Sequence, residues 1–198
     1  TKAHELIPSS PVLSYEKGLV LLQLGRLEEA EGLLKVAARK LTTHYTLDLL
    51  HASCAYVIGK NESAKESLTE YLAEIPRDPE LSAIYLARLL QVDINKDKSG
   101  VKRGSDSAKN SHAATLGDPV LQYYNSVANR KAVLDWAGIA KSPEQARQQI
   151  CAAAFWMAQW EKAYGDPAKA KELSKIAVDA GSPDMTEWQF ANWQWGKN

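Results

Sequence analysis

The sequence is poor in several features on which specialised classes of protein depend. Its 24 basic side chains are balanced by 24 acidic ones, so the formal net charge is zero. A domain that grips nucleic acid through its phosphates carries a clear basic excess, and we therefore expect no nucleic-acid partner. No run of about 18 apolar residues occurs, so the sequence predicts no membrane-spanning segment.

Cysteine and histidine are also scarce. Cys54 and Cys151 are far apart in the sequence, and this pattern is typical of two small buried thiols, with a disulfide as the alternative. His44 and His51 would lie two turns apart on one helix, but no third ligand follows at a useful spacing. We therefore expect neither a metal site nor a cofactor.

The sequence contains no pattern that indicates catalysis. It has no glycine-rich phosphate loop and no signature around a serine or cysteine nucleophile. Glu28, Glu29 and Glu31 form an acidic cluster, but we expect all three on the solvent face of one helix. A general acid and base need carboxylates that face each other across a cleft. The sequence thus predicts a protein that is not an enzyme.

What the sequence does contain is an internal repeat. The segment LGRLEEAEGLL, residues 24–34, resembles a turn that leads into a second helix, and an equivalent segment follows at residues 58–68. The interval is 34 residues, which is the period of the tetratricopeptide repeat, a helix–turn–helix unit. The pairs that keep this interval are Gly18 and Ala52, Gly25 and Gly59, Ala30 and Ala64, and Leu34 and Leu68.

Each repeated residue type has a physical role in a helical hairpin. Small side chains permit two helices to approach closely where they cross. Glycine at positions 25 and 59 accepts the left-handed backbone conformation that ends a helix. Because one hairpin cannot bury its apolar stripe alone, neighbouring hairpins have to stack. The sequence therefore predicts an all-α fold, a tetratricopeptide-repeat (TPR) solenoid of helix–turn–helix pairs.

We predict a single TPR-like helical domain over residues 1–198. Residues 93–119 are polar and short of large apolar side chains, which is typical of a long loop. Helical patterns return after this loop, and Gly165 and Ala170 keep the spacing of the first hairpin. The expected repeats lie near residues 11–44, 45–78, 79–92 (partial) and 151–184.

The C-terminal part of the chain has a more particular resemblance. It contains LQYYNSVANRKAVLDWA, QICAAAFWMAQWEKAYGDPAKAKELSKIAVDAG and EWQFANWQW, which together resemble the end of bacterial lipoproteins of the NlpI family. The resemblance covers most of residues 14–195. It implies a non-catalytic adaptor of the bacterial cell envelope, often a homodimer, that holds proteases or peptidoglycan hydrolases. It also implies a periplasmic or envelope location, and without it we would expect a cytoplasmic one.

The predicted partner site is the concave face of the solenoid. The first helix of each TPR hairpin lines this face, and apolar side chains there suit an extended or helical peptide with apolar anchors. The alternative is that the C-terminal helices of the same chain fill the groove. The expected contact residues are Val12, Tyr15, Leu19, Leu22, Leu49, Ser53, Tyr56 and Phe155.

The last helix is expected to carry aromatic residues on both faces. Trp188 and Trp195 share one face, whereas Phe190 and Trp193 point the other way. The outer face of a terminal repeat should be polar and exposed to solvent. Phe190 and Trp193 therefore indicate a contact with a partner or a second copy, with a docked tail as the alternative. The predicted function is therefore a protein- or peptide-binding adaptor or scaffold, and its rival is a homodimerisation module without a peptide ligand.

Overall fold

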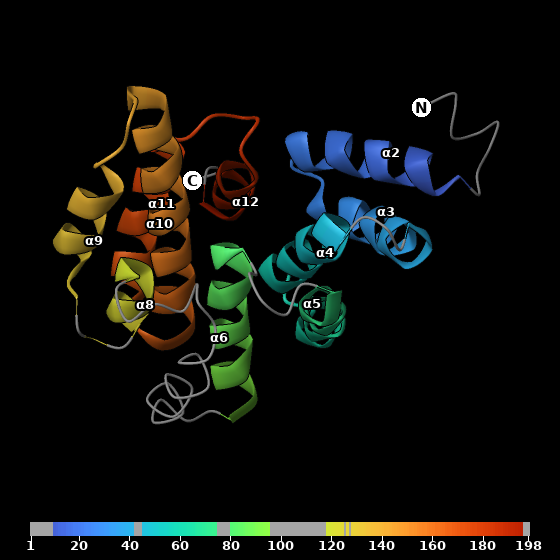
Figure 1. The fold of residues 1–198 in the computed structure, drawn as a ribbon, viewed down its shortest axis with the longest axis horizontal. Coiled ribbons are helices and arrows are strands. Elements are labelled where there is room, and N and C mark those ends of the chain that lie inside the picture. Colours follow the sequence, from blue (N-terminus) through green and yellow to red (C-terminus); the bar gives the residue numbers. More distant parts are fainter. Residues whose placement is uncertain are drawn as a thin grey trace. The chain divides into compact units, whose positions relative to one another are not determined.

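The structure is a computed structural model. The residues that it describes are 10–41, 45–74, 80–95, 118–124, 126 and 128–195, with the side chains of 91–95 excepted. Over these residues the regular structure consists of ten α-helices and no strand (Figure 1). The predicted all-α class is therefore confirmed. None of the helices in the described ranges is both long and apolar enough to cross a lipid bilayer.

The chain divides into two compact units, residues 1–76 and 77–198. Cys54 belongs to the first unit and Cys151 to the second, and both are buried free thiols, as the sequence predicted. The prediction of one domain over the whole chain stays a prediction. Most of the segment predicted as a polar loop, 93–119, lies outside the described residues.

The first unit consists of two consecutive helical hairpins. Its helices are α2 (Pro11–Gln23), α3 (Leu27–Lys40), α4 (Tyr45–Val57) and α5 (Asn61–Glu74). Within the unit α2 packs on α3, α3 on α4 and α4 on α5, so each helix contacts the next along the chain (Figure 1). At the start of α2 the Ser10 side chain accepts a hydrogen bond from the Leu13 amide at 3.4 Å, which caps the helix at its N-terminus.

The repeated residues occupy equivalent places in the two hairpins. Gly25 and Gly59 each follow the first helix of a hairpin, with positive φ angles of 68° and 84° that side chains rarely adopt. Gly18 lies close to Leu34, since an added Cβ atom would meet Leu34 Cδ2 at 3.0 Å. The chain therefore repeats a helical hairpin at the predicted interval. The fully buried alanines of the repeat are Ala30, Ala52 and Ala64.

Two glycine substitutions should change the stability of the first unit in opposite directions. At Gly59 an added Cβ meets no atom within 4 Å, but the φ of +84° remains, so Gly59→Ala should cost about 1 kcal/mol in backbone strain. Gly32 is exposed in the middle of α3 with equally open space, so Gly32→Ala should stabilise the unit by up to about 1 kcal/mol. Urea denaturation followed by circular dichroism measures both changes. Shifts of the same sign would contradict the role of Gly59 as the left-handed end of a helix.

The second unit is built around one long helix. Its helices are α6 (Leu81–Asn95), α8 (Pro119–Tyr124), α9 (Arg130–Ala137), α10 (Pro143–Tyr164), α11 (Pro167–Ala180) and α12 (Thr186–Trp195). α10 packs against each of the other five. It starts at a Ser142 cap followed by Pro143 and ends at Gly165, as the sequence predicted. α6 continues beyond residue 92, where the partial third repeat was expected to end.

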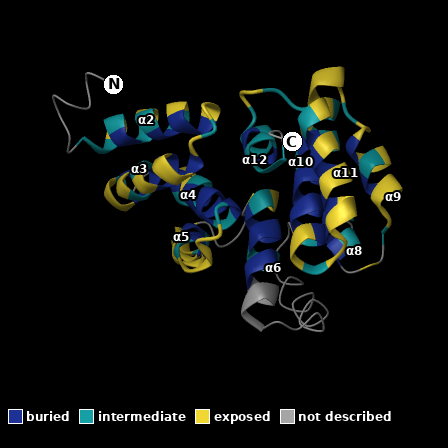
Figure 2. Cartoon of the chain, turned by 180° about the vertical axis from the view of Figure 1, so that it is seen from behind, coloured by how far each residue is buried: buried dark blue, intermediate teal, exposed yellow. Residues whose placement is uncertain are grey.

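Aromatic side chains form the core of the second unit. Trp156 is 2% exposed, and Tyr124 stacks on Trp160 with ring centroids 4.7 Å apart and planes 14° apart. The Tyr124 hydroxyl donates a hydrogen bond to the Trp156 carbonyl at 3.0 Å, and the Tyr164 hydroxyl donates one to the Leu89 carbonyl at 2.9 Å. Figure 2 shows buried residues along α10 and α6, and exposed ones along α9 and α11. The hydroxyl groups of Tyr124 and Tyr164 are thus paired with backbone carbonyls.

Candidate functional site

The last helix, α12, is fixed against two other helices. Phe190 is 1% exposed, and its ring centroid lies 6.0 Å from that of Phe155 on α10. On another side of α12, the Trp188 indole N–H donates a hydrogen bond to the Val178 carbonyl of α11 at 3.1 Å. One apolar and one polar contact therefore hold α12 between α10 and α11.

The turn before α12 and its last turn are also constrained. A Cβ atom at Gly181 would lie 2.7 Å from the buried Cys151 sulfur, so this close approach requires glycine. In the last turn of α12, the Gln194 side-chain oxygen accepts a hydrogen bond from the Gln159 amide of α10 at 2.8 Å. The helix therefore holds its final residue, Trp195, in a defined place.

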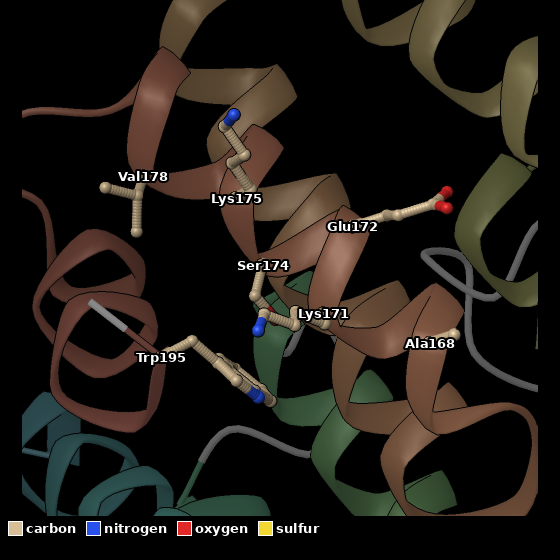
Figure 3. A pocket seen from close by; sticks show the side chains of 7 residues that line it. All are labelled: Ala168, Lys171, Glu172, Ser174, Lys175, Val178 and Trp195. Carbon is tan, nitrogen blue, oxygen red and sulfur yellow. The ribbon is translucent and has the colours of Figure 1, made fainter. Parts of the chain in front are cut away.

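A pocket lies between α11 and the indole of Trp195, and we call it the Trp195 pocket. Its volume is about 550 Å³, within the range of roughly 300–1,000 Å³ that is usual for ligand sites. Figure 3 shows the indole across from α11, with Val178 and Ala168 at opposite ends of the lining. The wall is mostly apolar. Besides Trp195, the lining residues are Ala168, Lys171, Glu172, Ser174, Lys175 and Val178.

A cation holds the Trp195 ring. Lys162 Nζ of α10 lies 5.7 Å from the ring centroid, which is within reach of a cation–π contact. Lys162 is exposed as a residue, but its ammonium end lies among protein atoms, and this burial lowers the pKa of Lys162. Within the pocket wall, the Ser174 hydroxyl donates a hydrogen bond to the Ala170 carbonyl at 2.6 Å, so its proton is already engaged. Apolar contact and lysine ammonium groups are what the pocket offers a ligand.

A second cleft, of about 610 Å³, lies where the turn between α8 and α9 meets α10 and α11. Several of its polar groups are paired with one another. The Tyr123 hydroxyl and the Asp166 amide donate hydrogen bonds to the Glu161 carboxylate at 2.5 and 2.7 Å, and Arg130 forms an ion pair with Glu172. Burial, followed by the contact with Glu161, raises the pKa of Tyr123. Because these groups satisfy one another, the Trp195 pocket is the stronger candidate for a ligand site.

The residues predicted for the concave face differ widely in exposure. Val12 is 52% exposed. The half-buried residues are Tyr15, Leu19 and Tyr56. The buried residues are Leu22, Leu49, Ser53 and Phe155. The four buried side chains have little surface to offer a partner, and the predicted contact set stays a prediction.

The two aromatic residues predicted as a partner face on α12 differ in burial, and a third aromatic residue lines the pocket. Phe190, predicted to face a partner or a second copy, is buried against α10, which corresponds to the alternative of a docked tail. Trp193 is half-buried. Trp195 lines the pocket, although no binding role was predicted for it. The available signal was its register with Trp188, because both residues lie on the side of α12 that meets α11.

A buried polar network connects the helices of the first unit. The side chain of Glu31 on α3 is only 4% exposed. One carboxylate oxygen accepts a hydrogen bond from Lys60 Nζ at 2.5 Å, and the other lies 3.0 Å from His51 Nε2. The second nitrogen of His51 lies 2.7 Å from Ser67 Oγ. The prediction that Glu31 faces solvent is therefore wrong, because residues from two other segments enclose and pair it.

The order serine, histidine, glutamate in this network is that of a hydrolytic triad, but its setting is structural. A triad needs a nucleophile open to substrate and free N–H donors for the oxyanion. Ser67 is 6% exposed and lies inside α5, where the backbone N–H groups are engaged in the helix. Elsewhere in the described ranges, no three His, Cys, Asp or Glu side chains gather as ligands for a metal ion.

The Trp195 pocket is therefore the candidate site, because it combines a preformed volume, an apolar wall and charged groups at its rim. The chain matches no protein-family model and has no significant match among the curated proteins.

Proposed function

We propose that this chain is a TPR-like adaptor that binds a segment of a partner protein and performs no chemistry. Two hairpins that repeat at the TPR interval, each with a left-handed glycine after its first helix, support the TPR assignment. The resemblance of residues 14–195 to the NlpI family supports a place in the bacterial cell envelope. It also supports a role in holding other proteins there.

The observation that carries this proposal is the Trp195 pocket. Tryptophan is among the residues that most often dominate binding energy at protein interfaces. Phe190 and Trp188 hold α12 in place, so the pocket is formed before a partner arrives. Binding to a preformed surface avoids much of the entropic cost of ordering it. A partner that inserts one apolar side chain beside Trp195 therefore gains affinity from a small contact area.

Self-association is the second candidate function, and a different surface favours it. Val12, Val20 and Leu24 are 52%, 45% and 63% exposed along α2 and at its end. Large apolar side chains that stay exposed along one helix can form part of an interaction surface. A second copy that covered them would produce a homodimer without a peptide ligand. Sedimentation of the full chain over a range of concentrations distinguishes a dimer from a monomer.

Trp195→Ala should abolish most peptide binding by the full chain. The experiment selects peptides from a random displayed library on the wild-type protein and measures their affinities by fluorescence anisotropy. We expect the selected peptides to bind Trp195→Ala at least about 30-fold more weakly, as is usual for a central tryptophan anchor. The physical reason is that the indole forms one wall of the pocket.

Trp136→Ala is the matched control. Trp136 is 42% exposed on α9, and the wall of the Trp195 pocket comes from α11 and α12. Its removal should leave affinities unchanged, and circular dichroism should show the same helicity in both variants. Equal binding by Trp195→Ala and wild type would refute the pocket as the binding site, and a library that yields no binder would refute the proposed function.

A further inference from the structure

We infer that the Trp195 pocket selects an acidic segment of a partner protein, in which an aromatic or aliphatic anchor lies next to aspartate or glutamate. The inference rests on the proposed function, because it names the class of segment that the same pocket takes. It is carried by the lysines of the pocket wall, which form no ion pair with the described residues.

Two lysines of the pocket wall have no acidic partner within the described part of the chain. Lys171 and Lys175 are exposed and lie one helical turn apart on α11. Neither forms an ion pair with any side chain of the described residues. Glu172, the acidic residue of the wall, is bound to Arg130 on α9, and Figure 3 shows its carboxylate directed away from Trp195. The acid that would neutralise the lysines is thus already engaged elsewhere.

A third ammonium group adds to the local positive charge. Lys162 lies over the Trp195 ring at 5.7 Å from its centroid. The next acid along α11, Asp179, is exposed one turn beyond Lys175 and offsets only part of the charge of three lysines. The whole chain has a formal net charge of zero. The excess of positive charge is therefore local to this pocket. An approaching carboxylate relieves the repulsion among the ammonium groups and is steered toward them.

The rest of the wall favours an apolar anchor between the charges. Ala168, Val178 and the Trp195 indole present carbon surface, and the Ser174 hydroxyl is already bonded to the backbone. Against this carbon surface a neutral polar side chain would lose its water without gaining a hydrogen bond. An aromatic or aliphatic side chain buries its area against the indole at no such cost. The ligand that satisfies both parts of the site is apolar at its centre and acidic at its flank.

The test uses the full chain and three fluorescent hexapeptides. The acidic probe is Asp-Asp-Leu-Trp-Asp-Asp, the basic probe replaces each aspartate by lysine, and the third probe keeps the aspartates but replaces Leu-Trp by Gly-Ser. Anisotropy titrations compare the wild type with the double variant Lys171→Glu, Lys175→Glu. The control is Lys65→Glu with Lys141→Glu, which makes the same charge change at two exposed lysines outside the pocket wall.

We expect the acidic probe to bind wild type about tenfold more tightly than the basic probe, because several partly exposed charge pairs each contribute a few-fold. The pocket double variant should lose or reverse this preference, and the control double variant should keep it. At about 1 M salt, where the screening length is roughly 3 Å, the preference should disappear. The Gly-Ser probe should bind wild type at least tenfold more weakly than the acidic probe, because it lacks the anchor.

The outcomes separate this inference from the proposed function. Equal binding of the acidic and basic probes, or a library that yields neutral or basic binders while the acidic probe fails, would overturn the acidic preference and leave peptide binding intact. Tight binding of the Gly-Ser probe would overturn the apolar anchor. Binding of no probe and no library peptide would overturn the proposed function itself.

Discussion

Glu31→Ala should lower the free energy of unfolding of the first unit by about 2 kcal/mol at neutral pH. The Glu31 side chain is 4% exposed and pairs with Lys60 at 2.5 Å and with His51 at 3.0 Å. Removing it leaves His51, which is 1% exposed, with one unpaired nitrogen, and an unpaired buried polar group costs about 1–3 kcal/mol. Hydrogen exchange of the backbone amides of α3, α4 and α5 measures the loss within this unit.

Glu29→Ala is the matched control on the same helix. Glu29 forms an ion pair with Arg26 at 2.7 Å, but its side chain is 57% exposed and that of Arg26 is 55% exposed. Water replaces such a pair at little cost, so this variant should exchange its amides like the wild type. Indistinguishable results for Glu29→Ala and Glu31→Ala would mean that the buried network adds nothing to stability.

The pH dependence of the network follows from the sign of two pKa shifts. Burial works to raise the pKa of Glu31, but hydrogen bonds from Lys60 and His51 outweigh it and hold the pKa below its ordinary value of 4.5. Burial lowers the pKa of His51 below 6.5, although Glu31 opposes the shift. In both cases the unfolded chain binds the proton first, so each contribution is present above the unfolded pKa and is lost as the pH falls.

The advantage of wild type over Glu31→Gln should therefore persist down to about pH 5 and decline below 4.5, where Glu31 binds a proton in the unfolded chain before it does so in the folded protein. Lys35 and Arg39 also lower the pKa of His51. Burial, together with Glu70 and Glu74, raises the pKa of Asp48 to about 6, which acts on stability with the opposite sign. Lys35, Arg39 and Asp48 are present in both proteins, so comparing wild type with Glu31→Gln largely removes their effects, whereas the pKa of His51 changes with the substitution because Glu31 contributes to it.

Local chemistry made the helical hairpins predictable. The turns at Gly25 and Gly59 could be predicted from the backbone freedom of glycine and from the repeat interval along the chain. The Glu31 network was not predictable in that way, because His51 and Lys60 lie 20 and 29 residues further along the chain. From its neighbours in the sequence alone, a glutamate is expected to be exposed to solvent. The packing of α3 against α4 and α5 decides which side chains contact Glu31. No local sequence pattern predicts that packing.

The candidate site likewise has one feature that the sequence predicted and another that depends on helix packing. Helical periodicity correctly separated Phe190 from Trp188 and Trp195, since successive residues of a helix point in known directions. Periodicity does not say which faces other helices cover. In α12 one face meets α10 and another meets α11, so Phe190 is buried while Trp193 stays half-buried. The pocket exists because α11 lies opposite Trp195 in the fold, and periodicity does not predict that arrangement.

Phe190→Ala should lower the free energy of unfolding of the second unit by about 3 to 4 kcal/mol, which is typical of a fully buried phenylalanine. The Phe190 ring is 1% exposed and packs 6.0 Å from the ring of Phe155, so truncation leaves a cavity between α10 and α12. All six tryptophans belong to the second unit. Their fluorescence during urea denaturation therefore reports the unfolding of this unit alone.

Trp195→Ala is the comparison that separates a loss of stability from a loss of peptide binding. Trp195 is half-buried at the pocket, so its removal should cost no more than about 1 kcal/mol of stability and should still remove peptide binding. Phe190→Leu keeps most of the buried volume and should recover about half of the stability that Phe190→Ala loses. If Phe190 instead faced a partner, Phe190→Ala would weaken binding and leave unfolding unchanged. That result would contradict the docking of α12 on which the Trp195 pocket depends.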